Sequence, residues 1–520
     1  MLIGYVSDEN YQALADVAVE FRGPTGLRCR VRSGASGSID ADLPPGPYEI
    51  CLAHPGYGAK RTHADVGGPP VHFRLLSDRL LGYAWPKWCR GGDVVQFRLH
   101  SVEPCKVLLW RYGIRKELVR NIGWYDNHGP RAFTQTLPDG FFVESGVRWD
   151  DGFGLHRQRI RAPERSGLYY FHAKGESGAF FSFPLVVAPP RPQAPIAVLA
   201  STNTWNAYNP FGGRSNYILA ARMIDTPVVH AKTDLPRYRL ANYGEWRSSQ
   251  EFDPLSFDRP EPVNLVPEHV QCTDAIEGRQ ACHLAPAEWR LLGWLERQGY
   301  AYDLYADYQL HNGVLNLDAY RVLVLSTHPE YWSEEMYRAV KRWVHERGGR
   351  LMYLGGNGLN CKVEFLDDGA HMRCLNSWPE GFESRFHAHV ESEACLLGVV
   401  YSDPGAMTVA PYATVAADHW IFRGTGLQPG DVFGLRTLHA RYGDGASGHE
   451  TDKISPHSPS NVVLLAKGLN PDDGGAHMVY YETSSGGAVF SVGSITYPSA
   501  LLVDPPTSRI TENVLTAFLR

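Results

Sequence analysis

The chain has 520 residues, of which 43% are hydrophobic and 12% aromatic, a composition typical of folded proteins that excludes wholesale disorder. At roughly 100–200 residues per domain, this length predicts about three domains. Against 56 Asp and Glu, the 50 Lys and Arg give a net charge of −6, and because they form no basic block we expect no nucleic-acid partner.

Membrane insertion and export are not expected. No apolar run approaches the ~18 residues of a membrane span, and the start Met1-Leu2-Ile3-Gly4 lacks the basic region of an export signal. The nine cysteines are scattered along the chain, unlike the disulfide framework of a small secreted domain. We therefore expect free thiols and a cytoplasmic location.

Short β-type runs separated by turns fill residues 1–77. Val17, Val19 and Phe21 share one face of the first clear run, and the spacing of the runs predicts a small antiparallel sandwich. With Leu43-Pro44-Pro45-Gly46-Pro47-Tyr48 and Gly56-Tyr57, the segment resembles the carboxypeptidase-regulatory-like β-sandwich. That resemblance implies a structural or interaction module.

A second β-rich stretch covers residues 78–190, with apolar runs at 93–99, 106–110, 167–172 and 181–187. It predicts a second sandwich. The prolines of Pro189-Pro190-Arg191-Pro192 then predict a stiff linker, because consecutive prolines hold an extended backbone and cannot continue a sheet.

The pattern changes after the linker, and residues 193–520 predict an α/β domain. Apolar strands at 196–200, 302–305, 321–326 and 350–354 alternate with helices at 287–297 and from an N-cap at Ser333 to Gly348. This alternation predicts a mostly parallel sheet. Two late strands, at 478–481 and 488–492, are also expected.

Three unusual loops follow these strands. They contain Trp205-Asn206-Ala207-Tyr208, Thr327-His328-Pro329-Glu330 and Gly355-Gly356-Asn357-Gly358. Because ligands bind beyond the carboxyl ends of parallel strands, we expect the loops to meet in one crevice. The usual nucleophile, nucleotide and zinc signatures are missing, and we interpret Cys272 and Cys282, with His283 adjacent, as buried residues rather than a zinc site.

Residues 78–520 resemble the large subunit of N,N-dimethylformamidase and its relatives. Ala207-Tyr208-Asn209, Thr327-His328-Pro329-Glu330-Tyr331 and Tyr353-Leu354-Gly355-Gly356-Asn357-Gly358 carry the resemblance. It implies a glutamine-amidotransferase-like α/β fold and one mononuclear iron held by two Tyr and one Glu. By this likeness Tyr208 and Glu330 are iron ligands.

The resemblance also indicates where the remaining site residues should lie. The second ligating Tyr should precede an Arg-Pro pair, and Arg259-Pro260 points to Tyr243, with Tyr238 as the fallback. His328 and Asn357 fall where the family places polar residues beside the iron. We add Glu482, at the end of a late strand, as a further candidate for proton transfer.

This ligand set suits Fe(III), because two phenolates and one carboxylate sum to −3 and hard oxygen donors favour a hard cation. The leading hypothesis is an iron-dependent amidohydrolase that cleaves the C–N bond of a small amide with metal-activated water. One alternative is a non-catalytic protein that binds carbohydrate or another ligand, and another is zinc held by Glu330 and His328. Aromatic-rich sandwiches favour a homo-oligomer, and the sequence leaves a small partner subunit open.

Overall fold

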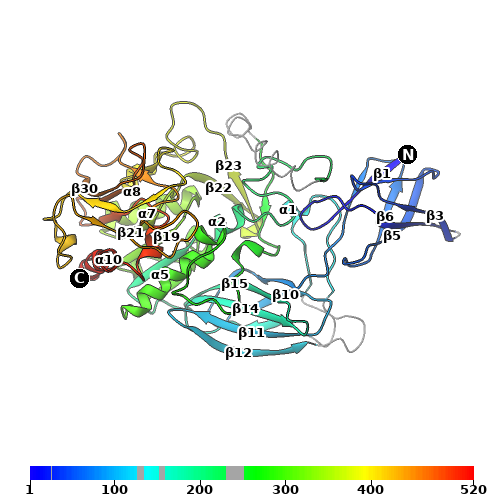
Figure 1. Cartoon of the computed structure of the whole chain (residues 1–520), viewed down its shortest axis with the longest axis horizontal. Coiled ribbons are helices and arrows are strands. Elements are labelled where there is room, and N and C mark those ends of the chain that lie inside the picture. Colours follow the sequence, from blue (N-terminus) through cyan, green and yellow to red (C-terminus); the bar gives the residue numbers. More distant parts are fainter. Residues whose placement is uncertain (25, 126–133, 151–157, 230–250) are drawn as a thin grey trace.

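The structure, a computed structural model, describes residues 1–24, 26–125, 134–150, 158–229 and 251–520. It is multidomain and rich in β-strands. Figure 1 shows a small sheet unit at the N-terminal end, a sandwich below the centre and a third unit around the C-terminus. Among the described residues, no helix is both long and apolar enough to cross a membrane.

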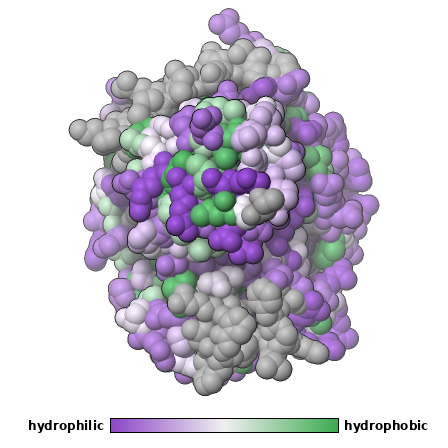
Figure 2. All heavy atoms as spheres, turned by 90° about the vertical axis from the view of Figure 1, so that its right-hand side faces the viewer, coloured by the Kyte–Doolittle hydropathy of each residue, from purple (hydrophilic) through white to green (hydrophobic). Residues whose placement is uncertain are grey.

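The first unit packs two sheets around one apolar core. Their strand orders are β4-β1-β7 and β3-β2-β5-β6, and Val19, Phe21 and Ile50 meet between them. Figure 2 views the molecule from this end, where hydrophilic side chains surround a few apolar ones. The strands are β1 (Leu2–Ser7), β2 (Ala18–Gly23), β3 (Gly26–Arg32), β4 (Ser38–Asp40), β5 (Gly46–Ala53), β6 (Lys60–Val66) and β7 (Val71–Arg74).

The second unit is another sandwich, with strand orders β13-β10-β8 and β12-β11-β14-β15-β9. Aromatic rings fill it: Phe171 lies 5.4 Å from Phe97 and 5.1 Å from Phe183 between ring centroids. Its elements are β8 (Leu81–Trp85), β9 (Trp88–Arg90), β10 (Val94–His100), β11 (Cys105–Tyr112), β12 (Lys116–Tyr125), α1 (Phe142–Ser145), β13 (Arg159–Arg161), β14 (Gly167–Gly175) and β15 (Phe180–Ala188).

The third unit contains a large mixed sheet of order β18-β16-β19-β21-β32-β31-β30-β26-β27. The pairs from β18 to β32 are parallel and those from β32 to β27 antiparallel. Its strands are β16 (Ile196–Ala200), β18 (Asp303–Ala306), β19 (Val322–Thr327), β21 (Arg350–Gly355), β26 (Tyr412–Thr414), β27 (Val432–Phe433), β30 (Val463–Gly468), β31 (His477–Glu482) and β32 (Ala488–Ser491).

The parallel strands expected from the sequence are confirmed, but the sheet is parallel over only part of its width. The antiparallel extension was not expected, because β26 and β27 are too short to show a periodicity. β31 and β32 match the two late strands that the sequence predicts.

Helices cover both faces of this sheet, because alternate side chains of each strand face opposite ways. Val322 and Val324 of β19 join the core beneath α5, whereas Leu323 and Leu325 join the core beneath α7. The helices are α2 (Thr202–Ala207), α5 (Ala285–Arg297), α6 (Asp307–His311), α7 (Glu334–Arg347), α8 (Ala394–Leu397), α9 (Tyr497–Ala500) and α10 (Pro505–Leu519).

The expected caps of α7 are both present. Ser333 Oγ accepts the N–H of Met336 at the helix start, and Gly348 ends the helix with a φ of 74°, a left-handed conformation that glycine adopts without strain. Smaller sheets complete the unit: β17 (Leu255–Ser256), β20 (Tyr331–Trp332), β22 (Cys361–Leu366), β23 (His371–Leu375), β24 (Val400–Tyr401), β25 (Val409–Ala410), β28 (Ser447–Gly448) and β29 (Asp452–Lys453).

Candidate active site

Two of the loops at the carboxyl ends of the parallel strands are hydrogen-bonded to each other. β16 leads into the short helix α2, and Tyr208 is the residue that caps its C-terminus. Thr204 in this helix donates its hydroxyl to the carbonyl of His328 at 2.8 Å and accepts the N–H of Glu330 at 3.1 Å. One hydroxyl therefore sets the distance between Tyr208 and the loop after β19.

Glu330 is the centre of the site. Its carboxylate is 1% exposed and lies 2.8 Å from Nε2 of His328. The phenol oxygen of Tyr208 lies 3.1 Å from Oε2, and the phenol of Tyr217 lies 2.9 Å from each carboxylate oxygen. Arg385 donates a further hydrogen bond to Oε1. The buried charge of Glu330 is thus fully compensated, as a buried carboxylate requires.

The site favours an ionised Glu330 and a protonated His328. Burial alone would raise the pKa of Glu330, but the hydrogen bond and charge of His328, together with the charge of Arg385, lower it to about 2. Burial opposes the charge of His328, yet contact with Glu330 outweighs it and raises the pKa of the imidazole. The two residues form a buried ion pair.

Unlike Glu330, the phenols of Tyr208 and Tyr217 are held in their protonated form. Burial and the carboxylate of Glu330 raise the pKa values of Tyr208 and Tyr217 well above 10. Their rings are stacked with centroids 4.1 Å apart, and Tyr208 donates to the oxygen of Tyr217 at 2.6 Å. For Tyr217 these effects outweigh the nearby charge of Arg385, and both phenols keep their protons at neutral pH.

The loop after β21 adds a third side to the site. Asn357 has a φ of 47°, its N–H donates to Asp452 at 2.7 Å and its amide nitrogen donates to Glu450 at 2.8 Å. Its Oδ1 has no partner among the described residues. Gly356 is needed beside it, because a Cβ there would lie 2.5 Å from the carbonyl oxygen of Glu450.

His283 packs on the other side of Tyr208. Its ring centroid lies 4.3 Å from that of Tyr208 and 5.3 Å from that of His328. The side chain is 3% exposed, and its Nδ1 has no hydrogen-bond partner in the part of the chain that the structure describes. A buried, unpaired ring nitrogen beside the phenols leaves a polar contact available to a bound molecule.

Of the residues that the sequence singled out, the structure brings Tyr208, His328 and Glu330 into contact. Asn357 lies beside them, because it donates to Glu450, which is 3.8 Å from Nδ1 of His328. Tyr243 and its fallback Tyr238 lie outside the described residues, so their assignment stays a prediction. Glu482 is not brought to the group: it is exposed and accepts a hydrogen bond from Tyr480. Because β31 runs antiparallel to β32, the end of β31 lies at the opposite edge of the sheet.

Sequence reasoning missed four residues of the site, Tyr217, His283, Arg385 and Glu450. Tyr217 lies nine residues after Tyr208 in a segment without strand or helix periodicity. Arg385 reaches Glu330 across 55 residues, and Glu450 lies in a bend between β28 and β29, which have two residues each and are too short to predict. The adjacency of Cys282 and His283 was the one available signal, and it was interpreted as structural.

The oxygen donors fit a hard, highly charged cation. The oxygens of Tyr208, Tyr217 and Glu330 that contact one another are 2.6–3.1 Å apart. Metal–oxygen bonds of about 2.0–2.2 Å place neighbouring ligand oxygens about 3 Å apart. Two phenols and a carboxylate favour such a cation over a softer one.

Comparison with known proteins identifies relatives. The family described as "N,N-dimethylformamidase beta subunit-like, C-terminal" matches residues 116–509. The N,N-dimethylformamidase beta subunit of Paracoccus aminophilus is 28% identical over 435 residues, a match that covers 72% of this chain and 54% of the relative. The beta subunit of an Alcaligenes species is 26% identical over 463 residues, a match that covers 72% of this chain and 59% of that relative. The chain thus spans little more than half the length of these relatives.

Proposed function

Because the chain belongs to the N,N-dimethylformamidase beta subunit-like family, we propose that it hydrolyses the C–N bond of a small amide. The observation that carries the proposal is the convergence of Tyr208, Tyr217 and His328 on Glu330. The parallel half of the large sheet, with this group at its carboxyl edge, supports assigning the third unit to a glutamine-amidotransferase-like fold.

The proposal includes one iron(III) per chain. Tyr208 and Glu330 would hold it with a second phenol, for which Tyr217 is the candidate among the described residues and Tyr243 the candidate from the sequence. Bound there, iron would supply a Lewis acid that polarises an amide carbonyl and acidifies water. Its positive charge would also lower the pKa of the phenols, which burial raises.

His328 has the geometry of a proton donor. Its Nδ1 lies 3.1 Å from the carbonyl of Gly356 and its Nε2 lies 2.8 Å from Glu330. Both partners accept hydrogen bonds, so an imidazolium satisfies both contacts. Hydrolysis attaches the oxygen of water to the carbonyl carbon and leaves a proton for the departing nitrogen, and His328 is placed to deliver that proton.

Asn357 and His283 would bind the substrate or its attacking water. The free Oδ1 of Asn357 and the free Nδ1 of His283 are buried polar atoms without described partners. Asn357 Oδ1 can accept a hydrogen bond, and His283 Nδ1 can accept or donate one according to its tautomer. The two relatives are named as beta subunits, and we extend the proposal to assembly of this chain with a second, different subunit.

Elemental analysis with a visible spectrum tests this function. About one iron per chain, with the charge-transfer band of a phenolate bound to Fe(III), and hydrolysis of simple N-alkylated formamides are the expected results. Glu330→Gln should lose both iron and activity. A colourless protein that stays inactive after iron is added would instead support the non-catalytic ligand-binding alternative, and zinc lost on Glu330→Gln would support the zinc alternative.

A further inference from the structure

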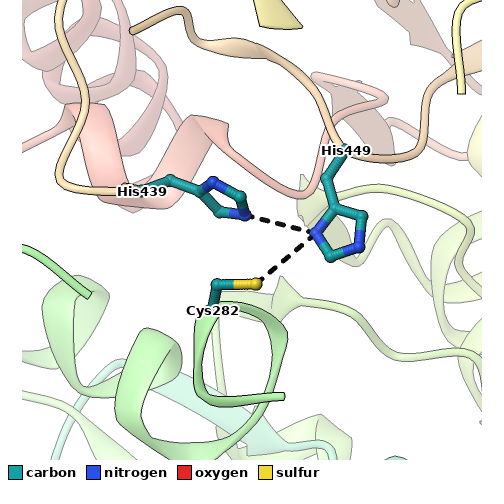
Figure 3. Close-up of side chains that lie close together, drawn as sticks. All are labelled: Cys282, His439 and His449. Carbon is teal, nitrogen blue, oxygen red and sulfur yellow. Dashed lines mark hydrogen bonds between the residues drawn. The ribbon is translucent and has the colours of Figure 1, made fainter. Parts of the chain in front are cut away.

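A second group of buried side chains that could bind a metal lies next to His283. It is separate from the oxygen cluster, by which we mean the oxygens of Tyr208, Tyr217 and Glu330. Cys282 Sγ, His439 Nε2 and His449 Nδ1 all lie within 4.8 Å of one another, and Figure 3 shows the three side chains turned toward one another. His439 Nε2 is 3.2 Å from His449 Nδ1, and Cys282 Sγ is 3.8 Å from the same nitrogen. The three residues are at most 3% exposed.

These separations match the edges of a tetrahedral zinc site. Zn–N bonds of about 2.0–2.1 Å and a Zn–S bond of about 2.3 Å place two nitrogens about 3.3 Å apart and a sulfur about 3.6 Å from each nitrogen. The observed 3.2 and 3.8 Å are close to these values. One ion could therefore bind all three atoms with small side-chain movements, which leaves a fourth position for water.

The donor atoms also decide which metal fits. One thiolate and two imidazoles form a soft donor set that favours zinc, whereas the phenol and carboxylate oxygens around Glu330 favour a hard cation. The two groups lie close together, because the ring centroid of His283 is 5.2 Å from that of His449 and 4.3 Å from that of Tyr208. The two neighbouring groups of side chains would therefore favour different metals.

Three contacts must change when a metal binds. The proton between His439 Nε2 and His449 Nδ1 must move to the other ring nitrogen of its histidine, so that both atoms can bind metal. Cys282 Sγ lies 3.1 Å from the carbonyl of Arg279 and can donate its proton there, and that proton leaves to solvent as the thiolate forms. Arg441 Nη1 lies 3.2 Å from His449 Nε2, the nitrogen that carries a proton when Nδ1 binds metal. Arg441 is only partly buried, so its long side chain can turn away.

We propose that Cys282, His439 and His449 bind a zinc ion that supports the oxygen cluster from behind. The ion would tie Cys282 to the segment that carries His439 and His449, which are 10 residues apart and begin more than a hundred residues after it. Cys282 lies in the short 3-10 helix Ala281–His283, whose last residue packs on Tyr208. His449 precedes Glu450, which accepts the hydrogen bond from Asn357. This site does not depend on the proposed amide hydrolysis.

Metal content of the full chain, purified without chelators or a metal-affinity tag, tests the site. Wild type should carry about one zinc per chain, and Cys282→Ser and His449→Ala should each lose it. Cys272→Ser is the matched control, because Cys272 is another buried free cysteine whose Sγ contacts the carbonyl of Trp289. Arg441→Gln should keep zinc. The change removes the positive charge of Arg441 beside Nε2 of His449, the nitrogen that carries a proton when Nδ1 binds zinc.

Cobalt(II) gives a second readout that does not need a variant to fold. Wild type stripped of metal and refilled with Co²⁺ should show a thiolate charge-transfer band and the intense visible bands of tetrahedral Co²⁺, and chelation should lower the unfolding temperature. Glu330→Gln should lose iron but keep zinc, which separates this site from the proposed function. Wild type with neither zinc nor a cobalt–thiolate band, or zinc retained by a folded Cys282→Ser, would overturn the proposal.

Discussion

The phenol of Tyr217 lies 2.9 Å from both carboxylate oxygens of Glu330, across 113 residues of sequence. The same phenol accepts a hydrogen bond from Tyr208 at 2.6 Å. Tyr217 therefore links the two residues that the sequence had already assigned to iron. In the proposed iron site, this position would make Tyr217 either a ligand or the group that orients the ligands.

Replacing Tyr217 with Phe separates these two roles. If Tyr217 is a ligand, Tyr217→Phe should lose most of the iron and shift or abolish the visible band, as we expect for Tyr208→Phe. If Tyr217 only orients the ligands, the affinity for iron should fall by about 10–100-fold, and the visible band should stay at the same wavelength. Tyr243→Phe provides the matched comparison, because loss of the band in that variant alone would assign the second phenolate to Tyr243.

Arg385→Met should destabilise the fold strongly. Arg385 is 5% exposed and pairs with Glu330, which is 1% exposed. It also donates to Asn360 at 3.0 and 2.9 Å, so methionine would leave a buried carboxylate short of a partner. Removing one member of a buried ion pair costs about 3–5 kcal/mol. Denaturant unfolding measures this, and Arg338→Met, at an exposed pair with Glu334, should cost under about 1 kcal/mol.

Glu450→Gln and Glu482→Gln test which late carboxylate serves the reaction. Glu450 is buried, accepts the hydrogen bond from Asn357 at 2.8 Å and lies 3.8 Å from Nδ1 of His328. Glu450→Gln replaces this carboxylate with a neutral amide, which should lower kcat by about 10–100-fold while iron stays bound. Glu482→Gln should leave kcat unchanged, because that side chain is exposed and bonded to Tyr480. The reverse order of effects would restore the assignment of Glu482.

Much of the third unit follows from local sequence, whereas the complete site does not. The strands around β19 and β21 and the caps of α7 are encoded by short apolar runs and by Ser333 and Gly348, so they could be predicted. Placing Glu330 at a strand end also followed from topology. The contacts of Arg385 and Tyr217 with Glu330 span 55 and 113 residues, and no local period or spacing encodes pairs at that separation.

Glu288→Gln should change how stability depends on pH. Glu288 accepts the indole N–H of Trp205 at 2.6 Å and the N–H of Ser201 at 3.3 Å, and burial raises its pKa from 4.5 to about 8. Between these values the folded chain keeps a proton that the unfolded chain loses. The free energy of unfolding of wild type should therefore fall, relative to Glu288→Gln, by up to about 1.4 kcal/mol per pH unit.

Unfolding curves of both proteins between pH 5 and 8 measure this difference. Glutamine keeps the shape of the side chain and an oxygen that can accept both hydrogen bonds, so the variant should equal or exceed wild type at pH 7–8. Parallel stability profiles over the whole range would show that Glu288 is already ionised in the folded protein.

The N-terminal sandwich holds the segment that carries Tyr217. Val228 and the segment near Tyr11 exchange backbone hydrogen bonds of 2.8 and 3.0 Å, and Gly212 donates to the carbonyl of Glu9 at 2.7 Å. Arg74, with 0% exposure, donates to the carbonyls of Asp8 and Gly212 at 2.9–3.2 Å. The first unit therefore fixes both ends of residues 212–228.

Arg74→Met should loosen this segment and, through it, the site. Methionine fills the space but leaves the carbonyls of Asp8 and Gly212 without their charged donor, each costing about 1–3 kcal/mol. Hydrogen exchange followed by mass spectrometry should show faster exchange in residues 212–228, with iron bound more weakly than in wild type. Arg30→Met is the control, because Arg30 pairs with Glu20 with 69% of its side chain exposed. Unchanged exchange in that segment, with the rest of the first unit destabilised, would mean that the sandwich does not support Tyr217.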